Sequence, residues 1–268
     1  MSVRTGYTQG TPCWPQLISG KPEDAVIFYE KVLGWTLELA GDGFFTARLD
    51  GKIVAGIMPP GESARDGWKR DEWLTFIAVD DAQESAQRFA GAGGKLHMQP
   101  MTVGDDDGVI FGGLDPAGAN VWFWQARDQF GAELVNQPGT VIWNEYNANS
   151  LPEDLRFYKD VLGVQWKKDG EGADAYYSIL VDGKMVAGAQ DKKTPQPSWV
   201  TYFAVSSLDD ALASVDLVGG KVVVPTMDVP DLGQMAGIED SGGAFLMLMQ
   251  PSPGMKEQPD EPITPDEA

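Results

Sequence analysis

The feature that most constrains how this chain can fold is an internal repeat. Short motifs of the first half return in the second half, in the same order and at offsets of 125 to 132 residues. The repeated motifs are Gly10-Thr11, Phe28-Tyr29, Val32-Leu33-Gly34, Asp50-Gly51-Lys52, Trp73, Gly93-Gly94-Lys95 and Asp115, which return as Gly139-Thr140, Phe157-Tyr158, Val161-Leu162-Gly163, Asp182-Gly183-Lys184, Trp199, Gly219-Gly220-Lys221 and Asp240. A unit of about 130 residues has therefore been duplicated, and each copy is long enough to bury a core.

Each copy is predicted to hold two modules of the form strand, helix, three strands. Apolar residues alternate along Thr11–Ser19 and Val141–Ala148, which is typical of strands, and the helices that follow are expected to stop at Gly34 and Gly163. The same order of elements starts again in the middle of each copy. The four expected modules span about residues 8–60, 71–127, 137–191 and 197–250.

The repeat also sets the domain boundaries. The two copies predict one domain over residues 1–130 and a second over residues 131–250. Residues 251–268 hold five prolines and five acidic residues against one lysine. Such a segment cannot bury enough apolar surface to order itself, so we expect a disordered tail.

The composition excludes several classes of partner. The chain carries 40 Asp and Glu against 20 Lys and Arg, whereas nucleic acid or an anionic membrane requires a basic face. One Cys and one His exclude a disulfide framework and a zinc site built from several such side chains. No run of 18 apolar residues and no hydrophobic leader is found. We therefore expect a cytoplasmic protein with no nucleic-acid or membrane partner and no cofactor.

The modules resemble the vicinal oxygen chelate superfamily, which includes glyoxalase I, extradiol dioxygenases and bleomycin-resistance proteins. The Phe-Tyr…Leu-Gly helix signature of each copy, the Gly-Gly-Lys turns and the Asp115-Pro116 approach to the last strand carry the resemblance, which covers residues 8–250. The chain looks most like the tandem-domain actinobacterial branch, some members of which accompany aromatic antibiotic biosynthesis. The resemblance implies an α+β fold in which four βαβββ modules form two glyoxalase-like domains with open, cup-shaped mixed sheets. Because the two domains can pair within one chain, we expect a monomer.

The resemblance also implies where a divalent ion would lie, on His, Gln or Glu side chains at inward strand positions. Carried over position by position, these places fall on Trp14, Leu74, Trp122 and residues 54–56 in the first domain, and on Trp143, Val200, Met247 and residues 186–188 in the second. Indole offers no lone pair, and a lone thioether suits soft metals. A shifted register would offer only Gln16 and Glu145, and one ligand per domain does not make a site. We therefore expect no metal.

An aromatic cup is predicted where the metal would have been held. Because side chains alternate along a strand, Gln16 shares a face with Trp14, and Glu145 and Asn147 share a face with Trp143. The predicted ligand-binding residues are Trp14, Gln16, Phe76, Trp122 and Trp124 in the first domain, and Trp143, Glu145, Asn147 and Tyr202 in the second. An apolar, aromatic cup with a few polar groups suits a small aromatic ligand.

Three functions remain open at this point. The first is a metal-free binding protein that holds an aromatic or polycyclic metabolite or antibiotic, for sequestration and resistance or as an accessory in biosynthesis. The second is a metal-independent enzyme, an isomerase, lyase or assisted hydroxylase, in which Glu145 or an aspartate near the cup moves a proton. The third is a cup filled by its own Trp side chains. Cys13 is expected to face away from the cup, and His97 to lie at the surface.

Overall fold

The computed structural model describes residues 2–61, 70–172, 175–192 and 196–253. Most of the tail that was predicted to be disordered therefore lies outside the described residues, although Pro251 ends the last strand. No helix within the described ranges is long and apolar enough to cross a membrane.

The two halves repeat one order of elements. The first half holds β2 (Pro12–Ile18), α1 (Pro22–Leu33), β3 (Thr36–Gly41), β4 (Phe44–Leu49), β5 (Lys52–Met58), β6 (Glu72–Ala78), α3 (Ala82–Gly91), β7 (Lys95–Val103), β8 (Gly108–Leu114) and β9 (Asn120–Ala126). The second half holds β11 (Val141–Ala148), α4 (Leu151–Leu162), β12 (Gln165–Asp169), β13 (Tyr176–Val181), β14 (Lys184–Asp191), β15 (Ser198–Ala204), α5 (Leu208–Leu217), β16 (Lys221–Val229), β17 (Gly233–Glu239) and β18 (Phe245–Pro251). The short strands β1 (Ser2–Val3) and β10 (Leu134–Val135) pair with each other.

The two glycines that were predicted to end helices do so. Gly34 and Gly163 follow α1 and α4 with φ of 73° and 76°, a left-handed conformation that costs glycine little. Ser207 caps α5 by accepting from the backbone N–H of Asp210. Ser150 precedes α4 without such a bond, because its hydroxyl donates to the Glu153 carboxylate instead.

Each half builds one open, mixed sheet of eight strands. The strand orders are β3-β4-β5-β2-β6-β9-β8-β7 and β12-β13-β14-β11-β15-β18-β17-β16. In the first sheet, β2 is parallel to β5 and β6 is parallel to β9, while β2 and β6 are antiparallel. The two modules of one half therefore share one sheet, a point that the sequence left open. The predicted α+β class with two domains is confirmed.

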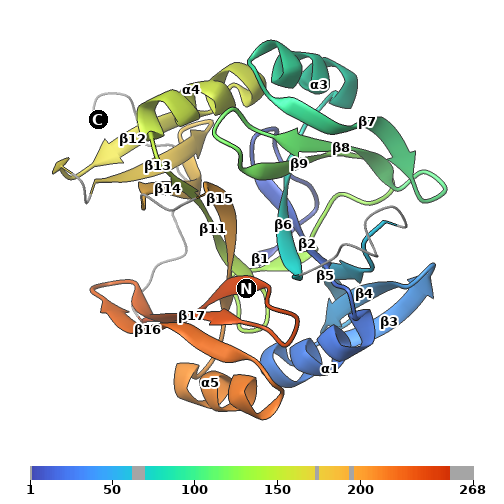
Figure 1. Cartoon of the computed structure of the whole chain (residues 1–268), viewed down its shortest axis with the longest axis vertical. Helices are drawn as coiled ribbons and strands as arrows, with labels where there is room; N and C mark the ends of the chain where they lie inside the picture. Colours follow the sequence, from blue (N-terminus) through green and yellow to red (C-terminus); the bar gives the residue numbers. More distant parts are fainter. Residues whose placement is uncertain (1, 62–69, 173–174, 193–195, 254–268) are drawn as a thin grey trace.

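The hydrophobic cores, in contrast, join the two halves. Helix α1 packs beside α5, and α3 packs beside α4 (Figure 1). One core combines residues of the first and fourth modules, among them Phe28 and Phe203, and the other combines the second and third modules, among them Phe89 and Phe157. The rings of Phe89 and Phe157 lie 5.2 Å apart with a T-shaped geometry. Neither half could bury its helices without the other half.

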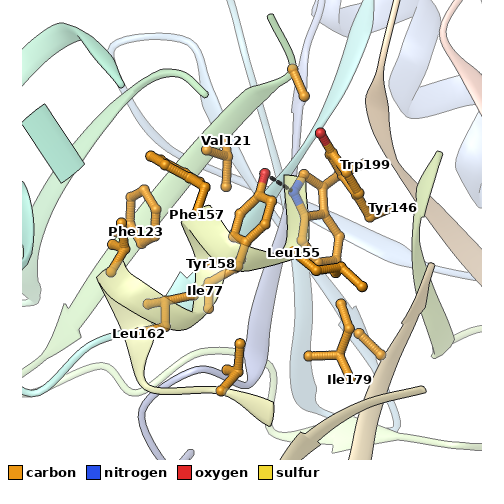
Figure 2. Close-up of a cluster of buried hydrophobic side chains, with 14 of the residues drawn as sticks. Ile77, Val121, Phe123, Tyr146, Leu155, Phe157, Tyr158, Leu162, Ile179 and Trp199 are labelled. Carbon is orange, nitrogen blue, oxygen red and sulfur yellow. Dashed lines mark hydrogen bonds between the residues drawn. The ribbon is translucent and has the colours of Figure 1, made fainter. Parts of the chain in front are cut away.

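Buried hydrogen bonds close each shared core. Tyr158 of α4 donates to Asp115 of the first half over 2.9 Å and accepts from Trp199 Nε1 over 2.8 Å, as Figure 2 shows for the second bond. The equivalent Tyr29 of α1 donates to Asp240 of the second half over 2.7 Å and accepts from Trp73 over 2.8 Å. Two of the repeated motifs, the helix tyrosine and the loop aspartate, thus bind each other across the halves.

Candidate functional site: two aromatic cups

The face of each sheet that points away from its helices forms a separate cluster, which we call the first cup and the second cup. Along β6, residues Trp73 and Ile77 face the shared cores, and the alternate residues face the cup. The first cup consists of Tyr7, Cys13, Trp14, Ile18, Leu74, Phe76, Ala78, Ile110, Trp122 and Trp124. The second consists of Ile142, Trp143, Val200, Tyr202, Met235, Phe245 and Met247.

The first cup is lined by aromatic rings from three adjacent strands. Trp14 on β2 lies opposite Phe76 on β6, and Phe76 lies beside Trp122 on β9. The rings of Phe76 and Trp122 are 5.6 Å apart, and those of Phe76 and Trp124 are 6.5 Å apart. The three tryptophans are partly exposed, whereas Phe76 is buried. This face therefore presents apolar rings that a ligand can reach.

Each indole N–H of the first cup has a partner within the chain. Trp14 donates to the side chain of Gln16 over 3.0 Å, Trp122 donates to Asn120 over 3.1 Å, and Trp124 donates to the carbonyl of Gln129 over 2.9 Å. Gln16 is 4% exposed and also donates to the Leu17 carbonyl over 3.4 Å. The ring faces, rather than polar groups, are thus what the first cup offers.

The second cup has a carboxylate at its centre. Glu145 is 5% exposed, accepts from the Tyr202 hydroxyl over 3.1 Å and lies 3.8 Å from Lys192 Nζ. Trp143 donates to the Tyr176 hydroxyl over 2.8 Å. Burial, reinforced by the Glu145 carboxylate, raises the pKa of both Tyr176 and Tyr202 well above the ordinary value. Both phenols therefore stay protonated, and Tyr202 donates to the carboxylate.

Two glycines make room for the rings. A Cβ on Gly188 would collide with the Tyr176 hydroxyl and come within 2.9 Å of Trp143 Nε1. A Cβ on the equivalent Gly56 would come within 2.8 Å of Phe44 and 3.0 Å of Trp14. Real Cβ atoms do not approach neighbours this closely. The first cup therefore depends on a glycine in β5, and the second cup depends on a glycine at the equivalent place in β14.

The cups offer few donors for a divalent ion. The residues at the positions that the resemblance implies for metal ligands lie in the cups, namely Trp14, Leu74 and Trp122 in the first and Trp143, Val200 and Met247 in the second. No group of three or more His, Cys, Asp or Glu side chains able to hold an ion occurs within the described residues. Gln16 offers an amide oxygen that already accepts from Trp14, and the second cup offers the Glu145 carboxylate and the Asn147 amide oxygen. This donor set does not fit a hard or borderline divalent cation.

One orientation predicted from the sequence is wrong. Cys13 was expected to face away from the cup, but it belongs to the first cup together with Leu74 and Phe76. The pairing of β2 with β6 shifts register between Pro12 and Trp14. Such an irregularity interrupts the alternation of side chains, so two successive residues reach the same face. Burial raises the pKa of the Cys13 thiol, which disfavours the reactive thiolate.

Three further residues line the cups and were missed. Phe44 packs in the first cup, and Tyr176 and Lys192 reach the second. The signal that could have found the two aromatics was the inward glycine on β5 and β14, which leaves space for a large neighbour. Asn147 was predicted correctly to share β11 with Glu145, and within the described part of the chain its buried Oδ1 has no hydrogen-bond partner.

Neither of two cavities lined by described residues holds the predicted ligand-binding set. A cavity of about 340 Å³ lies at the ends of β16, β17 and β18, and one of about 20 Å³ lies beneath Trp14, between Tyr7 and Asn144. The smaller one is about the size needed for a single water molecule. Trp122, Glu145 and Tyr202 line neither cavity. Glu145 and Tyr202 are buried, whereas Trp122 is partly exposed.

Comparison with known proteins places the chain in a family. The family model for the Glyoxalase/Bleomycin resistance protein/Dioxygenase superfamily matches residues 13–123. The Mycobacterium tuberculosis (strain CDC 1551 / Oshkosh) protein named "Putative glyoxylase CFP32" is 34% identical over 262 residues, which cover 94% of this chain and 99% of the relative. The "Anthracycline biosynthesis protein DnrV" of Streptomyces peucetius is 28% identical, with 92% and 95% covered.

Solved structures support the same fold. The Mn(II)-bound glyoxalase from Novosphingobium aromaticivorans superposes with a TM-score of 0.64 at 14% identity, covering 96% of this chain and 89% of that one. The halotolerant catechol dioxygenase BphC superposes with a TM-score of 0.61 at 15% identity, covering 96% and 91%. The resemblance inferred from the repeated motifs is confirmed: the chain belongs to the glyoxalase, bleomycin resistance protein and dioxygenase superfamily.

Proposed function

We propose that this protein binds a planar aromatic or polycyclic small molecule in its cups without a divalent metal ion. The observation that carries the proposal is the replacement of metal-ligand positions by partly exposed indole rings, with Trp14 and Trp122 beside Phe76. Flat rings bind flat ligands through stacking and apolar burial. The name of the Streptomyces peucetius relative, an anthracycline biosynthesis protein, supports an aromatic ligand in sequestration or in an accessory role in biosynthesis.

Binding of a simple polycyclic probe tests this proposal. Protein dialysed against EDTA is titrated with 2-naphthol by calorimetry, then again after addition of Mn²⁺, Ni²⁺ or Zn²⁺. We expect the same Kd in every case. We expect Trp122→Ala to weaken binding about tenfold, because it removes one stacking ring. Trp166→Ala is the matched control, since Trp166 packs on the core side of the second sheet. Binding that requires an added ion would overturn the proposal.

A second candidate function is a metal-independent enzyme acting on an aromatic natural product. The observation that favours it is the burial of Glu145 among two phenols, where a proton could move between the carboxylate and a ligand. Under this alternative, Glu145→Gln abolishes conversion while the ligand still binds. A ligand recovered chemically unchanged from the wild-type protein would argue against catalysis.

We further propose that the chain works as a cytoplasmic monomer. Its two halves already bury each other's helices in the shared cores. The Tyr29–Asp240 and Tyr158–Asp115 hydrogen bonds join the halves there. Light scattering after size-exclusion chromatography is expected to give a mass of 29.0 kDa. A mass of twice that value would contradict the monomer.

A further inference from the structure

The internal repeat allows the two cups to be compared residue by residue. Glu145 of the second cup corresponds to Gln16 of the first, at an offset of 129 residues. Tyr202 corresponds to Phe76 at an offset of 126, and Tyr176 corresponds to Phe44 at an offset of 132. A carboxylate with two phenols in one cup thus stands where the other cup has an amide with two phenyl rings.

In the second cup these three residues form a single polar cluster. The Tyr202 hydroxyl donates to Glu145 Oε1 over 3.1 Å. Tyr176 accepts from Trp143 Nε1 over 2.8 Å, and the nearby Glu145 carboxylate adds to the burial that raises the pKa of its phenol. The Tyr202 donor orients the carboxylate. A carboxylate that is 5% exposed is costly to bury unless a cation balances it.

The ion pair between Glu145 and Lys192 is long, so the carboxylate can also bind a cation of the ligand. Lys192 Nζ lies 3.8 Å from Glu145, at the outer limit of an ion pair, and the Lys192 side chain is 43% exposed. Asn147, two residues along the same face of β11, adds a buried Oδ1 acceptor that has no hydrogen-bond partner among the described residues. Two acceptors therefore face the same part of the cup, where a group with several N–H donors would satisfy both.

The first cup lacks these features. Gln16 has no net charge, and its amide is already bonded to Trp14 and to the Leu17 carbonyl. Phe44 and Phe76 carry no hydroxyl groups. A carboxylate on this face, Glu72 at the start of β6, is exposed and accepts from the Asn120 amide over 3.4 Å. Among the described residues, the first cup therefore has rings for stacking and no buried carboxylate beside them.

We propose that the two cups select different ligands, the second taking an aromatic compound that carries a protonated amine and the first taking an uncharged aromatic ring. The ammonium group would bind Glu145 and Asn147 Oδ1, and the adjoining ring would lie against Trp143. The inference rests on the proposed function, because it assumes that the cups bind aromatic compounds.

Two probes of equal shape test the inference. 2-Naphthylmethylamine is protonated at pH 7, and 2-naphthylmethanol is uncharged. Tryptophan labelled with fluorine reports on each cup by NMR, with the Trp143 and Trp122 signals assigned from the Trp143→Phe and Trp122→Phe variants. We expect the Trp143 signal to titrate with the amine at a concentration about tenfold to a hundredfold lower than with the alcohol. The Trp122 signal should show no such preference.

The variant Glu145→Gln removes the charge and keeps the shape, and it should abolish the preference at Trp143. Gln16→Glu at the equivalent place in the first cup is the matched control and should leave the ratio at Trp143 unchanged. The wild-type protein gives a second reading, because the preference should vanish when the pH is raised above the pKa of the probe amine.

The outcomes separate the two proposals. If both probes bind but Glu145→Gln and high pH leave the ratio unchanged, the inference is overturned and the proposed aromatic binding stands. If neither probe shifts Trp122 or Trp143 at any concentration, the proposed function fails and the inference fails with it.

Discussion

Replacement of the buried tyrosines by phenylalanine tests whether the two halves form one cooperative unit. Tyr29→Phe deletes a hydroxyl that donates to Asp240 and accepts from Trp73. Loss of a hydrogen bond to a charged group costs about 1.5–3 kcal/mol, and a buried donor left without a partner costs about 1–3 kcal/mol more. We therefore expect Tyr29→Phe to lower the free energy of unfolding by about 3–5 kcal/mol.

The equivalent hydrogen bonds of the other core allow this cost to be compared within the same protein. Asp115 Oδ2 accepts from both Tyr146 and Tyr158, whereas Asp240 Oδ2 accepts from Tyr29 alone among the described residues. Tyr146→Phe removes one donor and strands no partner, so its cost should be about 1–2 kcal/mol. The cost of Tyr158→Phe should lie between the other two, because Tyr146 still serves Asp115.

Urea unfolding at pH 7, followed by circular dichroism and by tryptophan fluorescence, measures these costs. Because each core combines residues of both halves, we expect one transition with the same midpoint by both probes. Equal costs for Tyr146→Phe and Tyr29→Phe, or two separate transitions, would refute the reasoning.

The remaining predictions concern a helix cap, a titrating carboxyl and a cup glycine. Ser207→Ala should cost about 1 kcal/mol in urea unfolding because it removes an N-cap bond, whereas Ser150→Ala should cost less, since Ser150 makes no such bond. Burial raises the pKa of Asp154 to about 6 from 3.8, so its folded form holds a proton that the unfolded form has lost, and stability falls as the pH rises from 4 to 7. Asp154→Asn should remove this part of the pH dependence, on the order of 1 kcal/mol after allowance for solvent screening, and an unchanged profile would contradict the assignment. Gly188→Ala should displace Tyr176 and weaken binding of 2-naphthylmethylamine at the second cup, measured by the same fluorine NMR titration, and unchanged affinity would argue against this geometry.

Most of the fold could be predicted from the repeat. A motif that returns in order fixes the number and sequence of modules, and the glycines at the ends of α1 and α4 fix where those helices stop. Partners across the halves could not be predicted, since nothing local links Tyr29 to Asp240 over 211 positions. Such contacts depend on how the two sheets pack against each other.

The cups could be predicted only in part. Alternation along β2 and β11 places Gln16 and Glu145 correctly beside Trp14 and Trp143. The same rule gives the wrong face for Cys13, because a shift of register lies next to it. Lys192, which contacts Glu145, directly follows the end of β14. A flexible side chain outside the strand leaves no periodic signal in the sequence.

Native mass spectrometry tests the central claim most directly. Protein treated with EDTA is incubated with an extract of the cells it comes from, desalted and sprayed under native conditions, and the bound compound is then released. Metal-independent binding predicts a non-covalent adduct whose released mass equals that of a compound already in the extract, and a weaker adduct for Trp122→Ala. An adduct that forms only with an added divalent ion, or a released compound of changed mass, would contradict the account.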